Sequence, residues 1–121
     1  MLIPDEVLVY VERMIYLPIV LKILERDRRV LAYAPLKLNG PYLTLIDQVT
    51  QQVHTELRET KAYLTRHQMQ VLRLGKDELF TEYQFIYKGY EEKRRYLNLR
   101  LRNRSDELLT AYLTAASTPT A

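Results

Sequence analysis

Residues 4–24 read PDEVLVYVERMIYLPIVLKIL, a long run dominated by apolar residues. A proline followed by two acids is typical of a helix start. The missing N–H of proline costs nothing there, because the first N–H groups of a helix have no intrahelical partner, and the positive end of the helix dipole favours acids. Pro35 disfavours helical geometry in the residue before it, so the helix should stop by Ala34. The apolar residues recur with heptad spacing, at Val7, Met14 and Leu21 in one position and at Tyr10, Leu17 and Leu24 in the other.

The opposite side of this predicted helix is also apolar. A helix that is apolar on both sides lies at the centre of a protein or meets a second chain. A chain of 121 residues offers only two other long helices to cover it, so we expect a homodimer. Pro18 should kink the helix without ending it, because the heptad pattern continues across it. The predicted dimer face consists of Leu8, Ile15, Ile19 and Ile23.

The first apolar run is long enough to be considered as a membrane span, but three charged residues interrupt it: Glu12, Arg13 and Lys22. Each charge near the bilayer centre costs roughly 2.5–3.5 kcal/mol, so we expect the helix to be buried in protein and predict no membrane contact. Acids precede the run where a signal peptide would carry positive charge, and the chain has no cysteine. Both observations favour a cytoplasmic protein.

A second helix is predicted from Asn39-Gly40-Pro41 to Arg66, since these first residues are typical of a helix start. Its apolar residues fall on one side and its polar residues on the other, which indicates a helix packed on one face and exposed to water on the other. The apolar side comprises Tyr42, Leu45, Ile46, Val49, Val53, Leu57, Tyr63 and Leu64.

Residues 69–88 have a different pattern. A β-prone stretch begins at Met69, a turn-like Gly75-Lys-Asp follows, and residues 80–87 alternate aromatic and polar side chains. This pattern predicts a small β-hairpin. The alternative is a helix that runs through Gly89, because six residues also fit helical spacing: Tyr83, Tyr87, Tyr90, Arg94, Leu97 and Leu101.

A third helix is predicted after Gly89, where Glu91 and Glu92 supply the acids of a first turn. Residues 105–107 resemble a second start signal, so a break near Asn103 stays open. The predicted fold is mainly α: a three-helix antiparallel bundle with a kinked first helix and a small β-hairpin between helices 2 and 3. Residues 1–114 are predicted to form one helical domain, and residues 115–121 are predicted to form a disordered tail. The predicted third helix has an apolar stripe that consists of Tyr90, Leu97, Leu101, Leu108 and Tyr112.

Two segments carry a resemblance to a known family. Residues 16–27 read YLPIVLKILERD, and residues 80–104 contain Phe80-Thr-Glu-Tyr, Lys88-Gly-Tyr and Arg95-Tyr-Leu-Asn. The chain resembles the YhjD-like family, small uncharacterised proteins of spore-forming Bacillus-type bacteria. The resemblance implies a cytoplasmic bacterial protein of unknown activity, and it transfers no catalytic residue.

A basic segment, residues 88–104, is the main candidate for an anion or nucleic-acid contact. It contains seven cations and two acids, with tyrosines between them, a composition that can clamp phosphates and stack on bases. As a helix, however, the segment would carry its charges on several sides. This favours the interpretation that these cations are solvated side chains on the flanks of an amphipathic helix, with their long stems over the core. The seven residues are Lys88, Lys93, Arg94, Arg95, Arg100, Arg102 and Arg104.

Metal, cofactor and catalytic sites are not predicted. His54 and His67 would lie about 20 Å apart on one helix, too far to share a metal ion. Glu56 and Arg94 fall at apolar positions, where a charge needs a partner. We expect them to bond each other or a tyrosine hydroxyl, with a catalytic role for Glu56 as the alternative.

The sequence therefore predicts a small non-enzymatic interaction or structural protein that acts as a homodimer. The alternative is a small basic nucleic-acid-binding or regulatory protein that uses residues 88–104.

Overall fold

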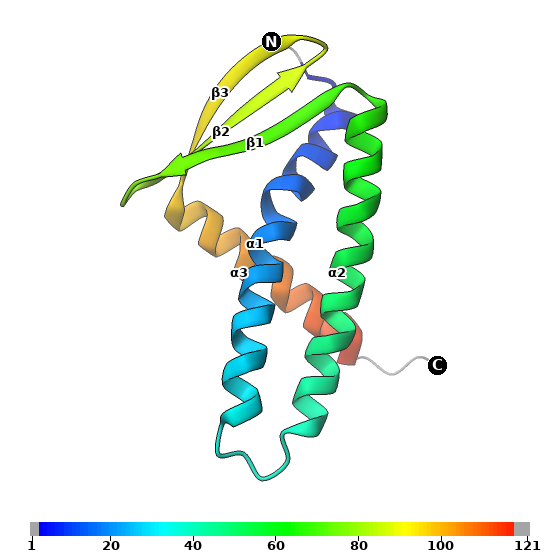
Figure 1. Ribbon diagram of the computed structural model, residues 1–121, viewed down its shortest axis with the longest axis vertical. Coiled ribbons are helices and arrows are strands. Elements are labelled where there is room, and N and C mark those ends of the chain that lie inside the picture. The colour runs from blue at the N-terminus through cyan, green and yellow to red at the C-terminus, as the bar shows by residue number, and fades with distance from the viewer. Residues whose placement is uncertain (1–2, 118–121) are drawn as a thin grey trace.

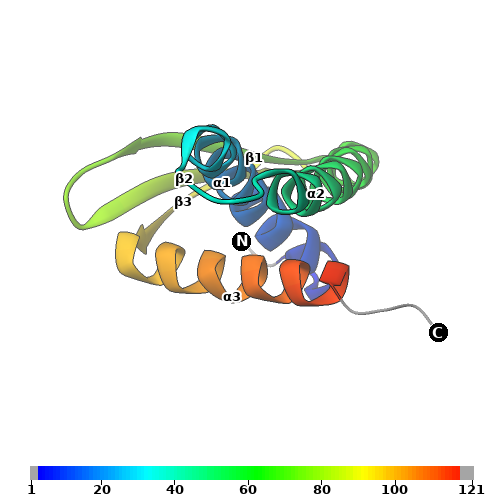
Figure 2. The ribbon, with the colours of Figure 1, turned by 90° about the horizontal axis from the view of Figure 1, so that it is seen from below.

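The computed structural model describes residues 3–117 as three helices and a three-stranded antiparallel sheet. Helices α1 and α2 form an antiparallel hairpin, the sheet lies at one end of it, and α3 crosses both helices (Figures 1 and 2). The elements in chain order are α1 (Asp5–Tyr33), α2 (Gly40–Arg66), β1 (Met69–Lys76), β2 (Phe80–Tyr87), β3 (Tyr90–Leu97) and α3 (Asn98–Ser117).

The predicted bounds of the first two helices are confirmed. α1 starts after Pro4, continues through Pro18 and ends one residue before Ala34. α2 has the predicted one-sided pattern, with its buried residues on a single stripe. The α1–α2 packing buries eight side chains in one core cluster: Leu17, Val20, Leu21 and Leu24 from α1, and Ile46, Val49, Val53 and Leu57 from α2.

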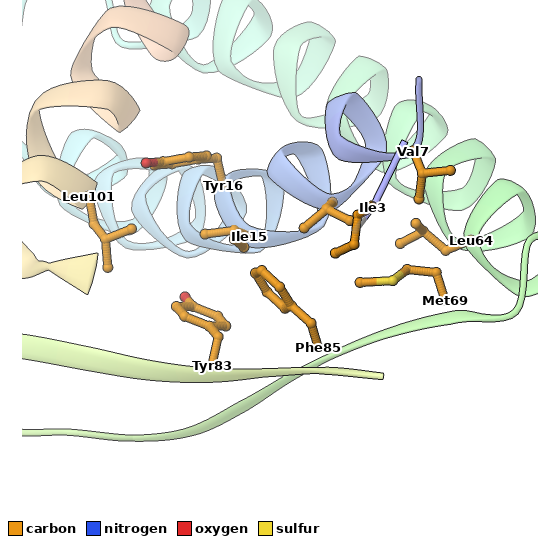
Figure 3. Close-up of a cluster of buried hydrophobic side chains, with 10 residues drawn as sticks. Ile3, Val7, Ile15, Tyr16, Leu64, Met69, Tyr83, Phe85 and Leu101 are labelled. Carbon is orange, nitrogen blue, oxygen red and sulfur yellow. The ribbon is translucent and has the colours of Figure 1, made fainter. Parts of the chain in front are cut away.

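A second core cluster joins the N-terminal half of α1 to the sheet, α2 and α3. Phe85 is fully buried and projects with Tyr83 from the sheet toward Ile15 of α1 (Figure 3). Truncation of such a buried aromatic side chain typically costs about 3–5 kcal/mol, so this contact contributes strongly to the attachment of the sheet. The other buried members are Ile3, Val7, Val11, Tyr16, Leu64, Met69 and Leu101.

The sheet has the order β1-β2-β3, with both pairs antiparallel. A two-residue turn, Lys88-Gly89, connects β2 to β3 and pairs Tyr87 with Tyr90. Both turn residues have positive φ, 49° for Lys88 and 85° for Gly89. Positive φ at both central residues is the signature of a type I′ turn, whose twist matches that of the flanking strands.

The predicted three-helix bundle with a small hairpin is therefore wrong. The hairpin of residues 69–88 exists, but residues 90–97 add a third strand instead of starting the third helix. Gly89 provides the turn conformation, and pairing with β2 satisfies the backbone of a segment whose charged side chains alone do not favour a strand. The third helix therefore starts at Asn98 and lies across the helical hairpin, not alongside it (Figure 2).

α3 also differs from its prediction in its details. It is continuous from Asn98 to Ser117, with no break near Asn103. Residues 115–117 of the predicted disordered tail belong to this helix, and residues 118–121 lie outside the described residues. In the apolar stripe predicted for the third helix, Leu101 is buried, whereas Tyr90 and Leu97 lie in β3 and are exposed.

The Lys88-Gly89 turn gives a first prediction. Gly89→Ala should destabilise the protein by about 1–2 kcal/mol, because an L side chain at positive φ is strained even where space is free. Gly40→Ala is the matched control, since Gly40 also has free space and has no positive φ. Urea unfolding followed by circular dichroism measures both. Equal stability of the two variants would contradict the turn assignment.

Candidate functional site

The structure distributes the seven predicted basic residues over the turn, the sheet and α3. Lys88 lies in the turn with its ammonium over the Tyr87 ring. Lys93 and Arg95 alternate with Arg94 along β3, so they lie on the outer face of the sheet and Arg94 on the inner face. Arg94 packs 5.0 Å over the Phe85 ring and bonds Glu92 at 3.3 Å.

The remaining three basic residues lie on α3. Arg100 packs over the Tyr96 ring, at 5.4 Å from its centroid, and Arg104 forms an ion pair with Glu107 at 3.0 Å. Arg102 instead lines a hollow with cations from other elements. The seven residues therefore do not form a single basic face.

The predicted dimer face of α1 is largely covered within the chain. Ile15 is 1% exposed beneath the sheet, and Leu8 and Ile19 are half-buried against the same core cluster. Ile23 is half-buried as well and lines the hollow that contains Arg102. For Ile15, the sheet thus supplies the cover that was expected from a second chain. Self-association itself stays a prediction.

Glu56 bonds a tyrosine hydroxyl, one of the partners predicted for it. The Tyr112 hydroxyl of α3 donates a hydrogen bond to the Glu56 carboxylate of α2. Burial first, and then this bond, raise the pKa of Tyr112 well above that of an ordinary tyrosine. The pair connects α2 to α3 beside a hollow of about 480 Å³ whose charged lining mixes Asp5, Glu12 and Glu56 with Arg13 and Arg104.

The two histidines occupy separate positions. His54 is exposed on α2, whereas the His67 ring stacks on Tyr63 at 3.9 Å and its Nδ1 lies 2.9 Å from the Tyr63 carbonyl oxygen. Within residues 3–117, no group of three His, Asp or Glu side chains is placed to hold a metal ion.

None of the helices described within residues 3–117 is long and apolar enough to cross a membrane.

The candidate site is a groove between α1, the sheet and α3. The groove consists of two adjoining hollows. The first has a volume of about 430 Å³; four of its lining residues are cations, and none of its other lining residues is an acid. Lys22 comes from α1, Arg73 and Lys76 come from β1, and Arg102 comes from α3. Among the ion pairs of residues 3–117, none includes these four side chains. The lining of this hollow therefore has a net positive charge.

A second, apolar hollow of about 240 Å³ adjoins the first. The two share Ile19, Lys22, Arg73 and Tyr83, so they form one groove with a cationic end and an apolar end. We call the two hollows together the cationic groove. The lining of its apolar end is completed by Met14, Ile15, Pro18 and Val71.

Asn98 connects the two walls of the cationic end. Its side-chain amide donates to the Asp77 carbonyl oxygen at 2.9 Å, and its side-chain oxygen accepts from the Thr81 hydroxyl at 2.6 Å. Its backbone N–H also donates to the Leu79 carbonyl oxygen at 2.8 Å. These bonds attach the start of α3 to the β1–β2 turn, so Arg102 and Lys76 lie on opposite walls of one hollow.

Two polar groups face the groove from its buried side. The Ser105 side chain is 1% exposed, and its hydroxyl has no hydrogen-bond partner among residues 3–117. Tyr83 lines both hollows; burial raises the pKa of its hydroxyl, although the nearby Arg73 opposes the shift. A buried hydroxyl without a partner costs about 1–3 kcal/mol, which a bound polar group could recover.

Sequence reasoning did not identify this groove. Lys22 was interpreted as an interruption of an apolar run, and Arg73 and Lys76 as part of a hairpin. The available signal was a single cation at position 22, within the otherwise apolar residues 14–24 of the first helix. Its partners in space could not be found, because they lie about 50 and 80 residues further along the chain.

Comparison with known proteins identifies the family. A family model described as "YhjD protein" matches residues 2–117. A Bacillus subtilis (strain 168) protein named "Uncharacterized protein YhjD" is 36% identical over 111 residues, which cover 92% of each chain. The chain belongs to the YhjD family. The resemblance predicted from residues 16–27 and 80–104 is confirmed. Neither comparison assigns the family a function, and no solved structure matches the chain.

The Glu56–Tyr112 bond gives a second prediction. Tyr112→Phe should lower the free energy of unfolding at pH 7 by about 1–2 kcal/mol, since the lost bond has a charged acceptor and is partly screened by water. Because the folded pKa is raised, this stabilisation is complete below about pH 10 and is lost as the pH rises through the folded pKa. Urea unfolding from pH 7 to pH 11 should therefore show a smaller alkaline loss for Tyr112→Phe than for the wild type. An unchanged pH profile would contradict the structural role of this bond.

Proposed function

We propose that the protein is a non-enzymatic binding protein of the cytoplasm whose ligand is a small amphipathic anion held in the cationic groove. The observation that carries this proposal is the arrangement of four cations beside an apolar hollow, with no acid in the lining and no ion pair of their own among residues 3–117. A pocket with an apolar body and a few convergent polar groups is typical of small-molecule sites. The cysteine-free sequence supports the cytoplasmic location.

The two ends of the groove suit two parts of one ligand. A phosphate or carboxylate head would lie between Lys22 and Arg102, with Arg73 and Lys76 on the strand side. An alkyl or aryl body would extend along Pro18, Ile19 and Val71, where burial of apolar surface adds affinity. The unpartnered Ser105 hydroxyl could donate to the head group.

The non-enzymatic part of the proposal rests on Glu56. This residue was expected either to bond a structural partner or to act as a catalytic acid. Its carboxylate accepts the Tyr112 hydroxyl and connects two helices, which is a structural task. Glu56 also lines a different hollow from the cationic groove. An acid engaged in this way is poorly placed to act on a ligand held between Lys22 and Arg102.

Calorimetric titration with three probes tests the proposal. Octyl phosphate should bind more tightly than either inorganic phosphate or octanol, because only the first fills both ends of the groove. Lys22→Gln with Arg102→Gln should weaken octyl phosphate binding roughly tenfold, since two partly exposed charge contacts are lost. Binding should also weaken as salt rises.

Arg58→Gln with Lys61→Gln is the matched control, because both side chains are exposed cations on α2 away from the groove. This control should bind octyl phosphate as the wild type does. Equal affinity for octanol and octyl phosphate, or equal weakening by both pairs of substitutions, would overturn the proposal.

A further inference from the structure

The end of the helical hairpin farthest from the sheet exposes a cluster of apolar side chains. This hairpin tip, residues 30–42, comprises the last turn of α1, the connecting loop and the first turn of α2 (Figure 1). Its exposed side chains and their exposed fractions are Tyr33 at 91%, Leu38 at 69%, Val30 at 59%, Tyr42 at 53% and Leu36 at 40%.

The loop of the hairpin tip is held in one conformation. The Asn39 amide donates to the carbonyl oxygens of Leu31, at 2.6 Å, and Ala34, at 3.0 Å. Pro35 and Pro41 restrict the backbone at each end of the loop. The apolar side chains are therefore presented to solvent by an ordered backbone, and exposed apolar clusters of this kind mark interaction surfaces.

The hairpin tip contains one charged residue, Lys37, and two further cations, Arg28 and Arg29, directly precede it. Arg28 bonds Asp47 at 2.6 Å, whereas Arg29 and Lys37 take part in no ion pair of residues 3–117. Because α1 ends and α2 begins here, their dipoles oppose each other at the tip. The positive field therefore comes mainly from Arg29 and Lys37.

We propose that the hairpin tip docks on an anionic lipid surface. This proposal departs from the predicted absence of membrane contact, which was argued from the charges that interrupt a membrane span in the first helix. Tyrosine and leucine side chains beside unpaired cations match the boundary between acyl chains and negatively charged headgroups. The tip is a helix-to-helix turn at one end of the molecule (Figure 1). A fluid bilayer can close around such a projecting tip, whereas a protein partner would need a matching cavity.

This docking is separate from the proposed function, because residues 30–42 contribute nothing to the cationic groove. Loss of ligand binding in the groove variants would leave docking unchanged, and loss of docking would leave octyl phosphate binding unchanged. The two proposals therefore fail independently.

Tyr33→Trp gives a direct test, because the chain contains no tryptophan. With vesicles of equal parts phosphatidylglycerol and phosphatidylcholine, its emission should shift to shorter wavelength, and brominated acyl chains should quench it. Tyr90→Trp is the matched control: Tyr90 is 71% exposed at the sheet end, and its emission should stay unchanged. Vesicles of phosphatidylcholine alone should produce neither effect.

A second variant pair tests the apolar contribution by co-sedimentation with the same vesicles. Leu36→Ser with Leu38→Ser should reduce the bound fraction at least about tenfold. Leu79→Ser with Leu99→Ser should not, although each of these leucines is 65% exposed. All four side chains are exposed, so circular dichroism should show folded variants.

Three results would overturn the proposal. The first is no emission shift for Tyr33→Trp on anionic vesicles. The second is equal binding to vesicles of phosphatidylcholine alone. The third is a lower sedimentation mass for Leu36→Ser with Leu38→Ser in the absence of vesicles, because that would make the hairpin tip a contact between two copies of the chain.

Discussion

The middle of helix α1, residues 14–24, must be covered on nearly all of its sides, and the rest of the structure depends on this constraint. α2 covers the C-terminal half of α1 through Val49 and Val53, both fully buried. The opposite side needs a different cover, because one amphipathic helix can occupy only one side. The sheet provides it by placing Phe85 and Tyr83 against Ile15.

The Lys88-Gly89 turn links this cover to the candidate site. Because the turn reverses the chain within two residues, β3 runs back along β2. α3 therefore begins next to the β1–β2 turn. Asn98 then attaches α3 to that turn, and α3 crosses α1 and α2 instead of extending along them. The groove forms at this crossing, where Leu101 and Ser105 of α3 meet Ile19 of α1.

The helical hairpin could be predicted from the sequence because its signals are local. Proline and acids at the start of α1, Pro35 after its end and the one-sided pattern of α2 each depend on a few neighbouring residues. The third strand could not be predicted in the same way. Glu91 and Glu92 match a helix start as well as they match an exposed strand, and pairing with β2 decides between the two.

The candidate site was beyond sequence reasoning for a related reason. Lys22, Arg73 and Arg102 come from three elements, and their proximity depends on the position of α3, which the predicted bundle placed differently. The predicted dimer face rested on a count of only two other long helices to cover α1, with no part given to the hairpin. Phe85 and Tyr83 of β2 in fact pack with Ile15, and self-association stays a prediction. In contrast, the bond of Glu56 to a tyrosine hydroxyl was predictable, because a carboxylate at the apolar edge of a helix requires a donor.

α1 also fixes the spacing between the two proposed surfaces. The helix is unbroken from Asp5 to Tyr33, so Lys22 in the groove and Tyr33 in the hairpin tip belong to one rigid rod. Eleven residues at 1.5 Å each separate them by about 16 Å along its axis. With the tip at the acyl boundary, the cationic groove would stand at or just above the headgroups of the same bilayer, since the polar layer is only several ångströms deep. An amphipathic anion leaving that surface would then meet Lys22 and Arg102 before it reached bulk water, and the positive field of the groove would favour its capture.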